Sequence, residues 1–200
     1  MNDLSATFWE ARYQSDTARW DLGQPAPPFV SLLASPAAPP PGRMIVLGMG
    51  RGHDALLFAQ HGFEVTGVDF APSAIAAAQA SATARGLSLT TLQQDIFDLG
   101  EPLARQFDYV LEHTCFCAIA LEQRPAYVRL VHQLLKPTGE LIALFWAHSM
   151  PGGPPFGTTP EEIRSLFTPY FVVDHLDPVT NSVASRANQE YLARFTKRTA

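Results

Sequence analysis

The stretch RMIVLGMGRGHD, residues Arg43–Asp54, decides the fold of this 200-residue chain. A short apolar run leads into three alternate glycines, Gly48, Gly50 and Gly52. An apolar run that ends in glycine is typical of a buried strand in a parallel sheet. Glycine at the end of such a strand lets backbone N–H groups and the next helix approach a ligand closely. The stretch therefore predicts a first buried strand followed by a ligand-binding turn.

Strands and helices alternate along the chain after this turn. Strands are predicted over 43–48, 63–70, 87–95, 107–113 and 140–148, and helices over 53–62, 71–86, 122–139 and 158–167. Strands that alternate with helices of this length favour a doubly wound parallel sheet. Two further strands, over 171–176 and 188–196, have no helix between them, so an antiparallel pair is expected at the sheet edge. The predicted fold class is α/β, with a mostly parallel, seven-stranded, Rossmann-like sheet.

The composition indicates one globular domain over 1–200 and disfavours two classes of partner. Hydrophobic residues make up 46% and charged residues 16%, which suffices for one core. The net charge is −5 with Lys and Arg scattered, so no basic footprint for nucleic acid is present. No apolar run approaches the roughly 20 residues that span a bilayer, and the N-terminus lacks a signal-peptide core. We expect a cytoplasmic monomer without nucleic-acid or membrane partners.

The cysteines and histidines suggest neither a disulfide scaffold nor a metal site. Cys115 and Cys117 are too few for a scaffold, and their spacing matches no common metal motif. We interpret them as packed thiols in a reducing compartment. The six histidines form no ligand-spaced cluster, so no metal is predicted.

The spacing of the glycines argues against a nicotinamide cofactor. The dinucleotide fingerprint is G-x-G-x-x-G, whereas this chain has G-x-G-x-G followed by His53 and Asp54. A bulky pair with an acid at the helix start disfavours a pyrophosphate. Asp69 closes the second strand, where a carboxylate can accept both ribose hydroxyls of a nucleoside. The alternative role for Asp69 is an N-terminal cap on the helix that follows.

Asp95 supplies a second acid at the end of the third strand. It is placed to accept a hydrogen bond from an adenine amino group, and Ile96 and Phe97 would flank the ring. The predicted site thus has two acids for a nucleoside and no cationic residues to bind phosphates. This favours S-adenosylmethionine, which carries an amino acid and a sulfonium in place of phosphates, over NAD.

Several segments, in order along the chain, together make a specific pattern. They are FWEARYQSDTARWDLGQPAPP from Phe8, GMGRGHDA from Gly48, GVDFAPSAI from Gly67, DIF from Asp95, EHTCFCAI from Glu112, LLKPTGELIALF from Leu134, GGPPF from Gly152 and, more weakly, SVASRANQEYL from Ser182. The chain thereby resembles class I S-adenosylmethionine-dependent methyltransferases, and more narrowly the thiopurine/thiol/halide methyltransferase family. Met49 departs from the Cys of many relatives. The resemblance implies S-adenosylmethionine as methyl donor and S-adenosylhomocysteine as product.

The resemblance also implies a lid over the cofactor, formed by residues 1–34, ahead of a Rossmann-like core over 43–200. Trp9 and Tyr13 share a helix face, and Trp20 opens WDLGQP, which would turn the segment back over the site. The alternative is a helix that packs its aromatic stripe on the domain. Aromatic faces attract a methyl sulfonium with about 0.5–2 kcal/mol, and a lid excludes water. The rest of the predicted cofactor site is Gly48, Gly50, Gly52, Asp54, Asp69, Phe70, Asp95, Ile96, Phe97 and Glu112.

The substrate side is expected in EHTCFCAI, after the fourth strand. His113, the candidate catalytic residue, would take a thiol proton or present a positive charge, with a hydrogen-bonded spacer as the alternative. Relatives carry Arg or Tyr at this position, so neither branch of the family settles the acceptor. Arg186 matches a substrate-side Arg of thiopurine-type enzymes, and its alternative is a solvated strand-end cation. The predicted substrate-binding residues are Phe8, His113, Phe116, Phe156 and Arg186.

Methyl transfer is an in-line displacement that depends mainly on alignment, so it needs no nucleophilic protein residue. We predict transfer to sulfur or another soft nucleophile of a small molecule: a thiol, bisulfide, thiocyanate, a halide or a thiopurine. Small-molecule N- or O-methylation is the alternative within the class. A non-catalytic nucleoside-binding module is the alternative from a different class, and a nicotinamide oxidoreductase is disfavoured by the glycine spacing.

Overall fold

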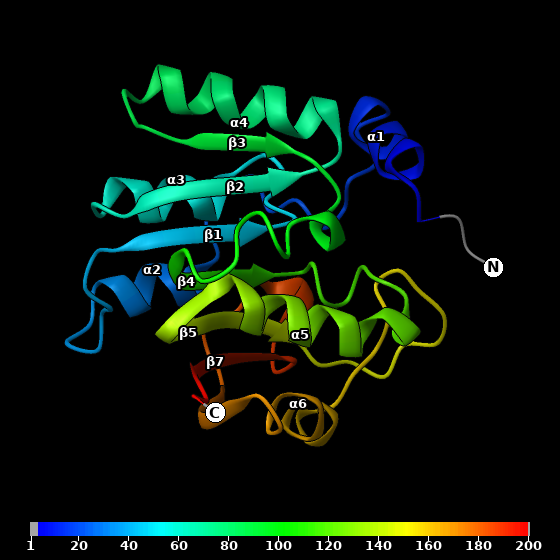
Figure 1. Cartoon of the computed structure of the whole chain (residues 1–200). Helices are drawn as coiled ribbons and strands as arrows, with labels where there is room; N and C mark the ends of the chain where they lie inside the picture. The colour runs from blue at the N-terminus through cyan, green and yellow to red at the C-terminus, as the bar shows by residue number, and fades with distance from the viewer. Residues whose placement is uncertain (1–3, 200) are drawn as a thin grey trace. The chain divides into compact units, whose positions relative to one another are not determined.

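The computed structural model describes residues 4–199 (Figure 1). Residues 1–3 and Ala200, which the predicted domain includes, lie outside the described part. The chain divides into two compact units, Met1–Ile96 (unit 1) and Phe97–Ala200 (unit 2). The organisation as one domain stays a prediction.

Unit 1 contains a parallel sheet in the strand order β3-β2-β1. Its elements are α1 (Ala6–Gln14), α2 (Pro27–Leu33), β1 (Arg43–Leu47), α3 (His53–Gln60), β2 (Glu64–Asp69), α4 (Pro72–Ala84) and β3 (Thr90–Gln93). Figure 1 shows α4 running alongside β3, with α1 next to the first turn of α4. The buried face of α4 is built from alanines, Ala74, Ala78 and Ala82, whose small side chains let neighbouring backbone approach closely.

Unit 2 contains the strands β4-β5-β7-β6. Its elements are β4 (Phe107–His113), η2 (Leu121–Gln123), α5 (Arg124–Leu134), β5 (Leu135–Trp146), α6 (Pro160–Phe167), β6 (Phe171–Pro178), η3 (Ala184–Arg186) and β7 (Glu190–Lys197), and η1 (Ile96–Asp98) spans the division between the units. β4 and β5 are parallel, whereas β5 with β7 and β7 with β6 are antiparallel. The predicted antiparallel C-terminal pair and the predicted mostly parallel, seven-stranded fold class are confirmed.

Aromatic rings fill the core of unit 2. Phe145 on β5 contacts Phe116, Phe167 and Phe195, with ring centroids 5.4, 5.5 and 6.2 Å away. α6 lies within the helix predicted over 158–167 and begins at Pro160, because Thr159 accepts a hydrogen bond from the Glu162 N–H at 3.2 Å. Both buried side chains of α6, at positions 163 and 167, are spaced one helical turn apart and face this core.

Two predicted boundaries were wrong. The helix predicted over 122–139 ends at Leu134, and β5 begins at Leu135, because Leu135 is buried and pairs with Phe107 of β4. Gly139, the predicted end of the helix, lies inside β5. A side chain would not fit there, since a Cβ at this position would lie 3.1 Å from the carbonyl oxygen of Asp108. The strand predicted over 87–95 is limited to Thr90–Gln93, since the Leu87 N–H is used in closing α4. Within the described residues, no helix combines the length and apolarity that crossing a membrane requires.

Candidate cofactor and acceptor sites

The turn after β1 has the backbone that its sequence predicts. Gly50 and Gly52 have φ of +56° and +79°, a left-handed conformation that residues with a Cβ rarely adopt. Gly52 is also the N-cap of α3, and a Cβ there would lie 2.9 Å from the Cβ of Ala78. We call residues 48–52 the glycine turn. Its bare backbone is required both by the left-handed conformation and by close packing against α4.

Asp69 connects the glycine turn to the start of α4. Its Oδ2 accepts a hydrogen bond from the Gly50 N–H, and its Oδ1 accepts one from the Ala71 N–H, both at 2.9 Å. Burial raises the pKa of Asp69, although these N–H groups oppose the rise. Asp69 does not cap α4, whose N-cap is Ala71 and which has no side-chain cap, so the alternative role as a helix cap is wrong. Its role toward a ribose stays a prediction.

The predicted aromatic residues pack against the glycine turn within unit 1. Tyr13 is buried, and its hydroxyl accepts a hydrogen bond from the Trp20 indole N–H at 3.2 Å. Trp20 makes edge-on contacts with Trp9 and Tyr13, with ring centroids 5.0 and 5.6 Å apart. Trp9 in turn contacts Phe8 at 5.1 Å. We call residues 8–20 the aromatic segment; it packs on Ala71 at the start of α4.

Besides the aromatic contacts, two carboxylates connect the N-terminal region to the rest of unit 1 by hydrogen bonds. Glu10 on α1 accepts hydrogen bonds from the Ser73 N–H and hydroxyl in the first turn of α4, and these bonds lower its pKa. Asp54, predicted to lie in the cofactor site, accepts a hydrogen bond from the Ala26 N–H at 2.7 Å. Asp54 therefore holds the start of α2, where Ala26 is the N-cap.

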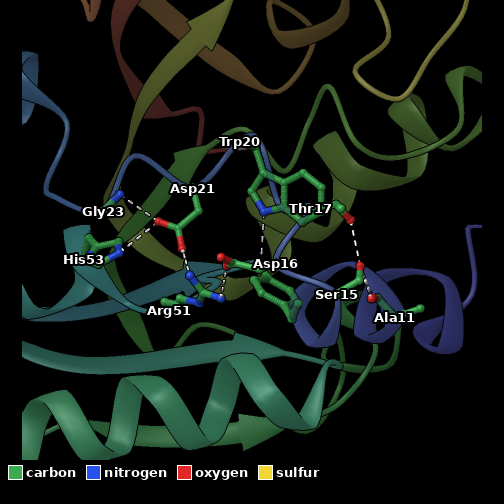
Figure 2. Close-up of polar contacts among 10 residues, drawn as sticks. Ala11, Ser15, Asp16, Thr17, Trp20, Asp21, Gly23, Arg51 and His53 are labelled. Atoms are coloured by element: carbon green, nitrogen blue, oxygen red, sulfur yellow. Dashed lines mark hydrogen bonds and ion pairs between the residues drawn. The ribbon is translucent and has the colours of Figure 1, made fainter.

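Asp21 is the third such carboxylate, and sequence reasoning missed it. Its side chain is 8% exposed and contacts both side chains that flank Gly52 (Figure 2). Asp21 Oδ2 lies 3.0 Å from Arg51 Nη1, and Oδ1 lies 2.9 Å from His53 Nε2. The hydrogen bond from His53 is the largest of the effects that lower the pKa of Asp21 to about 2. The available sequence signal was an acid directly after Trp20 and a basic residue on each side of Gly52.

The residues predicted to contact adenine lie where the sequence passes from unit 1 to unit 2. Asp95 is exposed, Ile96 is buried at the end of unit 1, and Phe97 opens unit 2. Phe70 is half-buried directly after Asp69. Their roles toward an adenosine stay predictions.

In unit 2, three polar side chains from separate elements meet. His113 closes β4, Arg186 lies in η3 and Glu190 opens β7. Arg186 Nη1 lies 3.0 Å from His113 Nε2 and 3.2 Å from Glu190 Oε1, and His113 Nε2 lies 3.8 Å from the same oxygen. Arg186 is 2% exposed, so its interpretation as a solvated strand-end cation is wrong. We call His113, Arg186 and Glu190 the polar triad.

Burial and charge act in opposite directions on this triad. Burial alone would raise the pKa of Glu190, but the neighbouring His113 and the charge of Arg186 hold it below its ordinary value. The guanidinium of Arg186 also lies 4.8 Å from the ring centroid of Trp146. A buried cation, a carboxylate and an imidazole are therefore assembled at the carboxyl end of β4. Glu190 was not predicted, because only the fold brings it to His113.

Two further predicted residues have structural contacts within unit 2. Glu112 is buried and accepts hydrogen bonds from the Phe116 N–H at 2.9 Å and the Tyr127 hydroxyl at 2.6 Å. Burial raises its pKa. The ring of Phe116 belongs to the aromatic core, and the Phe156 N–H donates to the Cys117 carbonyl at 2.7 Å. The roles of these side chains toward cofactor and acceptor stay predictions.

His148 is a buried imidazole that sequence reasoning did not single out. Its Nδ1 accepts a hydrogen bond from the Met150 N–H at 3.2 Å, and burial lowers its pKa. The proton of the neutral ring is therefore on Nε2, which has no hydrogen-bond partner among the described residues. Across residues 4–199, no group of three His, Cys, Asp or Glu side chains is arranged to hold a metal ion.

Residues 4–198 match the family model of thiopurine S-methyltransferases. The chain belongs to this family. Thiol methyltransferase 2 of Arabidopsis thaliana, described as probable, is 31% identical over 202 residues, which cover 98% of this chain and 88% of that protein. Thiocyanate methyltransferase 1 of Brassica oleracea is 32% identical over 193 residues, covering 94% of this chain and 84% of that protein.

Solved structures show the same fold for this methyltransferase. The Burkholderia thailandensis 1,6-didemethyltoxoflavin-N1-methyltransferase, solved with its namesake ligand and S-adenosylhomocysteine, matches 98% of this chain and 88% of its own. The TM-score is 0.77 and the identity 20%, so this likeness concerns the fold. The predicted family is confirmed, as is the predicted class of enzyme, an S-adenosylmethionine-dependent methyltransferase.

Proposed function

We propose that this methyltransferase transfers the methyl group of S-adenosylmethionine to the sulfur of a small thiol or of a comparable soft anion such as thiocyanate. The thiol and thiocyanate methyltransferases that are 31% and 32% identical over nearly the whole chain support this acceptor class.

The observation that carries the proposal is the contact between His113 and Arg186, 3.0 Å apart at the carboxyl end of β4. Ligands of open α/β sheets bind outside the carboxyl ends of the strands. A sulfur nucleophile reacts as the thiolate, yet a free thiol has a pKa of about 8.5. The site must therefore accept a proton or stabilise the anion. His113 offers the first and Arg186 the second.

In unit 1, we assign the glycine turn and Asp69 to the nucleoside of the methyl donor, and the aromatic segment to its sulfonium. The edge-on rings of Trp9, Tyr13 and Trp20 support this assignment, because a sulfonium has no N–H donors and is attracted to aromatic faces. The same rings would keep water from the methyl group. Residues 1–34 then serve as a lid for the cofactor, as the sequence predicts.

The reaction is an in-line displacement at carbon. The acceptor sulfur attacks the methyl carbon, a sulfur–carbon bond forms, and the bond between that carbon and the sulfonium sulfur breaks, so S-adenosylhomocysteine leaves uncharged at sulfur. A neutral thiol loses its proton to His113 Nε2 as the Arg186 guanidinium turns from that nitrogen to the thiolate, whereas thiocyanate has no proton to lose. Arg186 stabilises the anionic nucleophile before transfer.

The test is a screen of S-adenosylhomocysteine formation with iodide, bisulfide, thiocyanate, thiophenol and a thiopurine. We expect turnover with the sulfur nucleophiles. His113→Gln should slow an aliphatic thiol such as 2-mercaptoethanol at neutral pH and leave thiocyanate nearly unchanged, because only a thiol that is still protonated needs a proton acceptor. Turnover with none of these acceptors, despite thermal stabilisation by S-adenosylhomocysteine and none by NAD, would overturn sulfur methylation in favour of an N- or O-acceptor.

A further inference from the structure

Groups from two segments of unit 1 contact the carboxylate of Asp21. Oδ1 accepts a hydrogen bond from the Gly23 N–H at 2.9 Å and lies 2.9 Å from His53 Nε2. Oδ2 accepts one from Arg51 Nη1 at 3.0 Å. Figure 2 shows the carboxylate pointing at the Arg51 and His53 side chains. We call Asp21, Gly23, Arg51 and His53 the Asp21 network.

The network joins the two parts of unit 1 that the proposed function assigns to the methyl donor. Asp21 directly follows Trp20, whose indole bonds to the Tyr13 hydroxyl. Arg51 and His53 stand on either side of Gly52, the N-cap of α3. The carboxylate therefore fastens the end of the aromatic segment to the glycine turn. The aromatic segment covers this turn at Gly50, where an added Cβ would lie 3.0 Å from the Tyr13 hydroxyl.

The ion pair between Arg51 and Asp21 is the strongest interaction expected in the network. Bonds between a guanidinium and a carboxylate are charge-assisted, and an arginine keeps its charge at every physiological pH. Asp21 is 8% exposed at its side chain, so water screens the interaction little. Asp16 meets the same guanidinium at 3.4 Å but is 89% exposed, and exposed pairs contribute little. A separate connection from Glu10 to Ser73 holds α1 on α4 without the network.

We propose that Asp21 is a positioning residue for the cofactor: through Arg51 and His53 it holds the aromatic segment on the glycine turn, and it thereby sets how long S-adenosylmethionine and S-adenosylhomocysteine stay bound. This inference rests on the proposed assignment of the glycine turn to the methyl donor. Asp21 then affects how long the cofactor stays bound and has no part in binding or activating the methyl acceptor.

The test compares Asp21→Asn with the wild type in the full chain. The amide keeps the shape of the side chain and removes its charge. We expect the dissociation rate of S-adenosylhomocysteine, followed by tryptophan fluorescence in stopped flow, to rise about tenfold, since bonds to charged groups are the stronger kind. The KM for S-adenosylmethionine should rise similarly. The KM of the acceptor should be unchanged and kcat at saturating donor should not fall, which separates this role from a general loss of structure.

Asp16→Asn is the matched control. It removes the other carboxylate that reaches Arg51, and asparagine readily adopts the left-handed φ of +54° at that position. Its effect on dissociation should stay within about twofold, as for exposed pairs. Arg51→Gln serves as the second disabling variant if Asp21→Asn folds poorly. Arg51→Gln should also speed dissociation, and combining it with Asp21→Asn should add less than the sum of both effects.

The outcomes are distinguishable. Failure of the wild type to bind S-adenosylhomocysteine overturns the proposed function, and this inference with it. Tight binding by the wild type, with Asp21→Asn and Arg51→Gln releasing the ligand no faster than Asp16→Asn, overturns the inference alone. Faster release in both disabling variants, with the acceptor KM unchanged, supports it.

Discussion

The hydroxyl of Tyr13 lies 3.0 Å from the point that a Cβ atom on Gly50 would occupy. Tyr13 comes from α1 and Gly50 from the turn after β1, so two distant segments share one small volume. The missing side chain at Gly50 makes room for the tyrosine. The same hydroxyl accepts the hydrogen bond from Trp20. The glycine turn and the aromatic segment are therefore parts of one packing arrangement.

Gly50→Ala should disturb both the turn and the aromatic segment. The left-handed φ of +56° costs a residue with a Cβ about 1–2 kcal/mol, and the new methyl group would press on Tyr13. Gly86→Ala is the control, since its φ is +61° but no atom lies within 4 Å of the added Cβ. Urea unfolding should show a loss of about 1–2 kcal/mol in Gly86→Ala and a larger loss in Gly50→Ala, because only the latter also presses on Tyr13. Calorimetry should show weakened S-adenosylhomocysteine binding in Gly50→Ala only; equal affinities would contradict the shared arrangement.

Asp69→Ala should nearly abolish cofactor affinity. The substitution removes the acceptor of both the Gly50 and the Ala71 N–H bonds as well as the predicted contact to the ribose. Cys115→Ser should leave affinity largely intact, because Cys115 is a buried thiol of unit 2. Titration calorimetry with S-adenosylhomocysteine compares the two variants. Similar losses of affinity in both variants would show that affinity follows general stability, and would contradict the assignment of Asp69 to the cofactor.

The contribution of Asp21 to stability should depend on pH only in the acid range. Its folded-state pKa, about 2, lies below the ordinary value of 3.8. The carboxylate's stabilisation is therefore fully present above about pH 5 and is lost as pH falls toward 2. The difference in unfolding free energy between the wild type and Asp21→Asn should shrink below pH 4. A difference that stayed constant down to pH 2 would mean that the charge of Asp21 contributes nothing.

Glu190→Gln should destabilise unit 2 strongly. The substitution leaves the guanidinium of Arg186 buried without its carboxylate, and breaking a buried ion pair in this way costs about 3–5 kcal/mol. Asp177→Asn is the control, because the His175–Asp177 pair is 67% and 70% exposed and should contribute less than about 1 kcal/mol. Denaturant unfolding of both variants measures the contrast. Equal losses would show that the polar triad does not stabilise the fold.

Local sequence patterns specified most of the elements. The apolar run of β1 and the glycines after it predict a strand and a turn, since strand periodicity and left-handed φ are properties of neighbouring residues. The pattern over 158–167 likewise predicted α6. The error at Leu135 came from the same kind of pattern, because LLKP continues the apolar spacing of α5 although Leu135 already pairs with Phe107.

The sequence by itself thus determined the fold class, the glycine turn and the family, because each is written in residues that are neighbours or in ordered motifs along the chain. The tertiary structure decided which side chains meet. Asp21 reaches Arg51 across 30 residues, and His113 reaches Arg186 across 73, and nothing in the local pattern of either residue records its partner. Such pairs arise only when burial brings distant segments together, and there an unpaired charge would cost too much to keep.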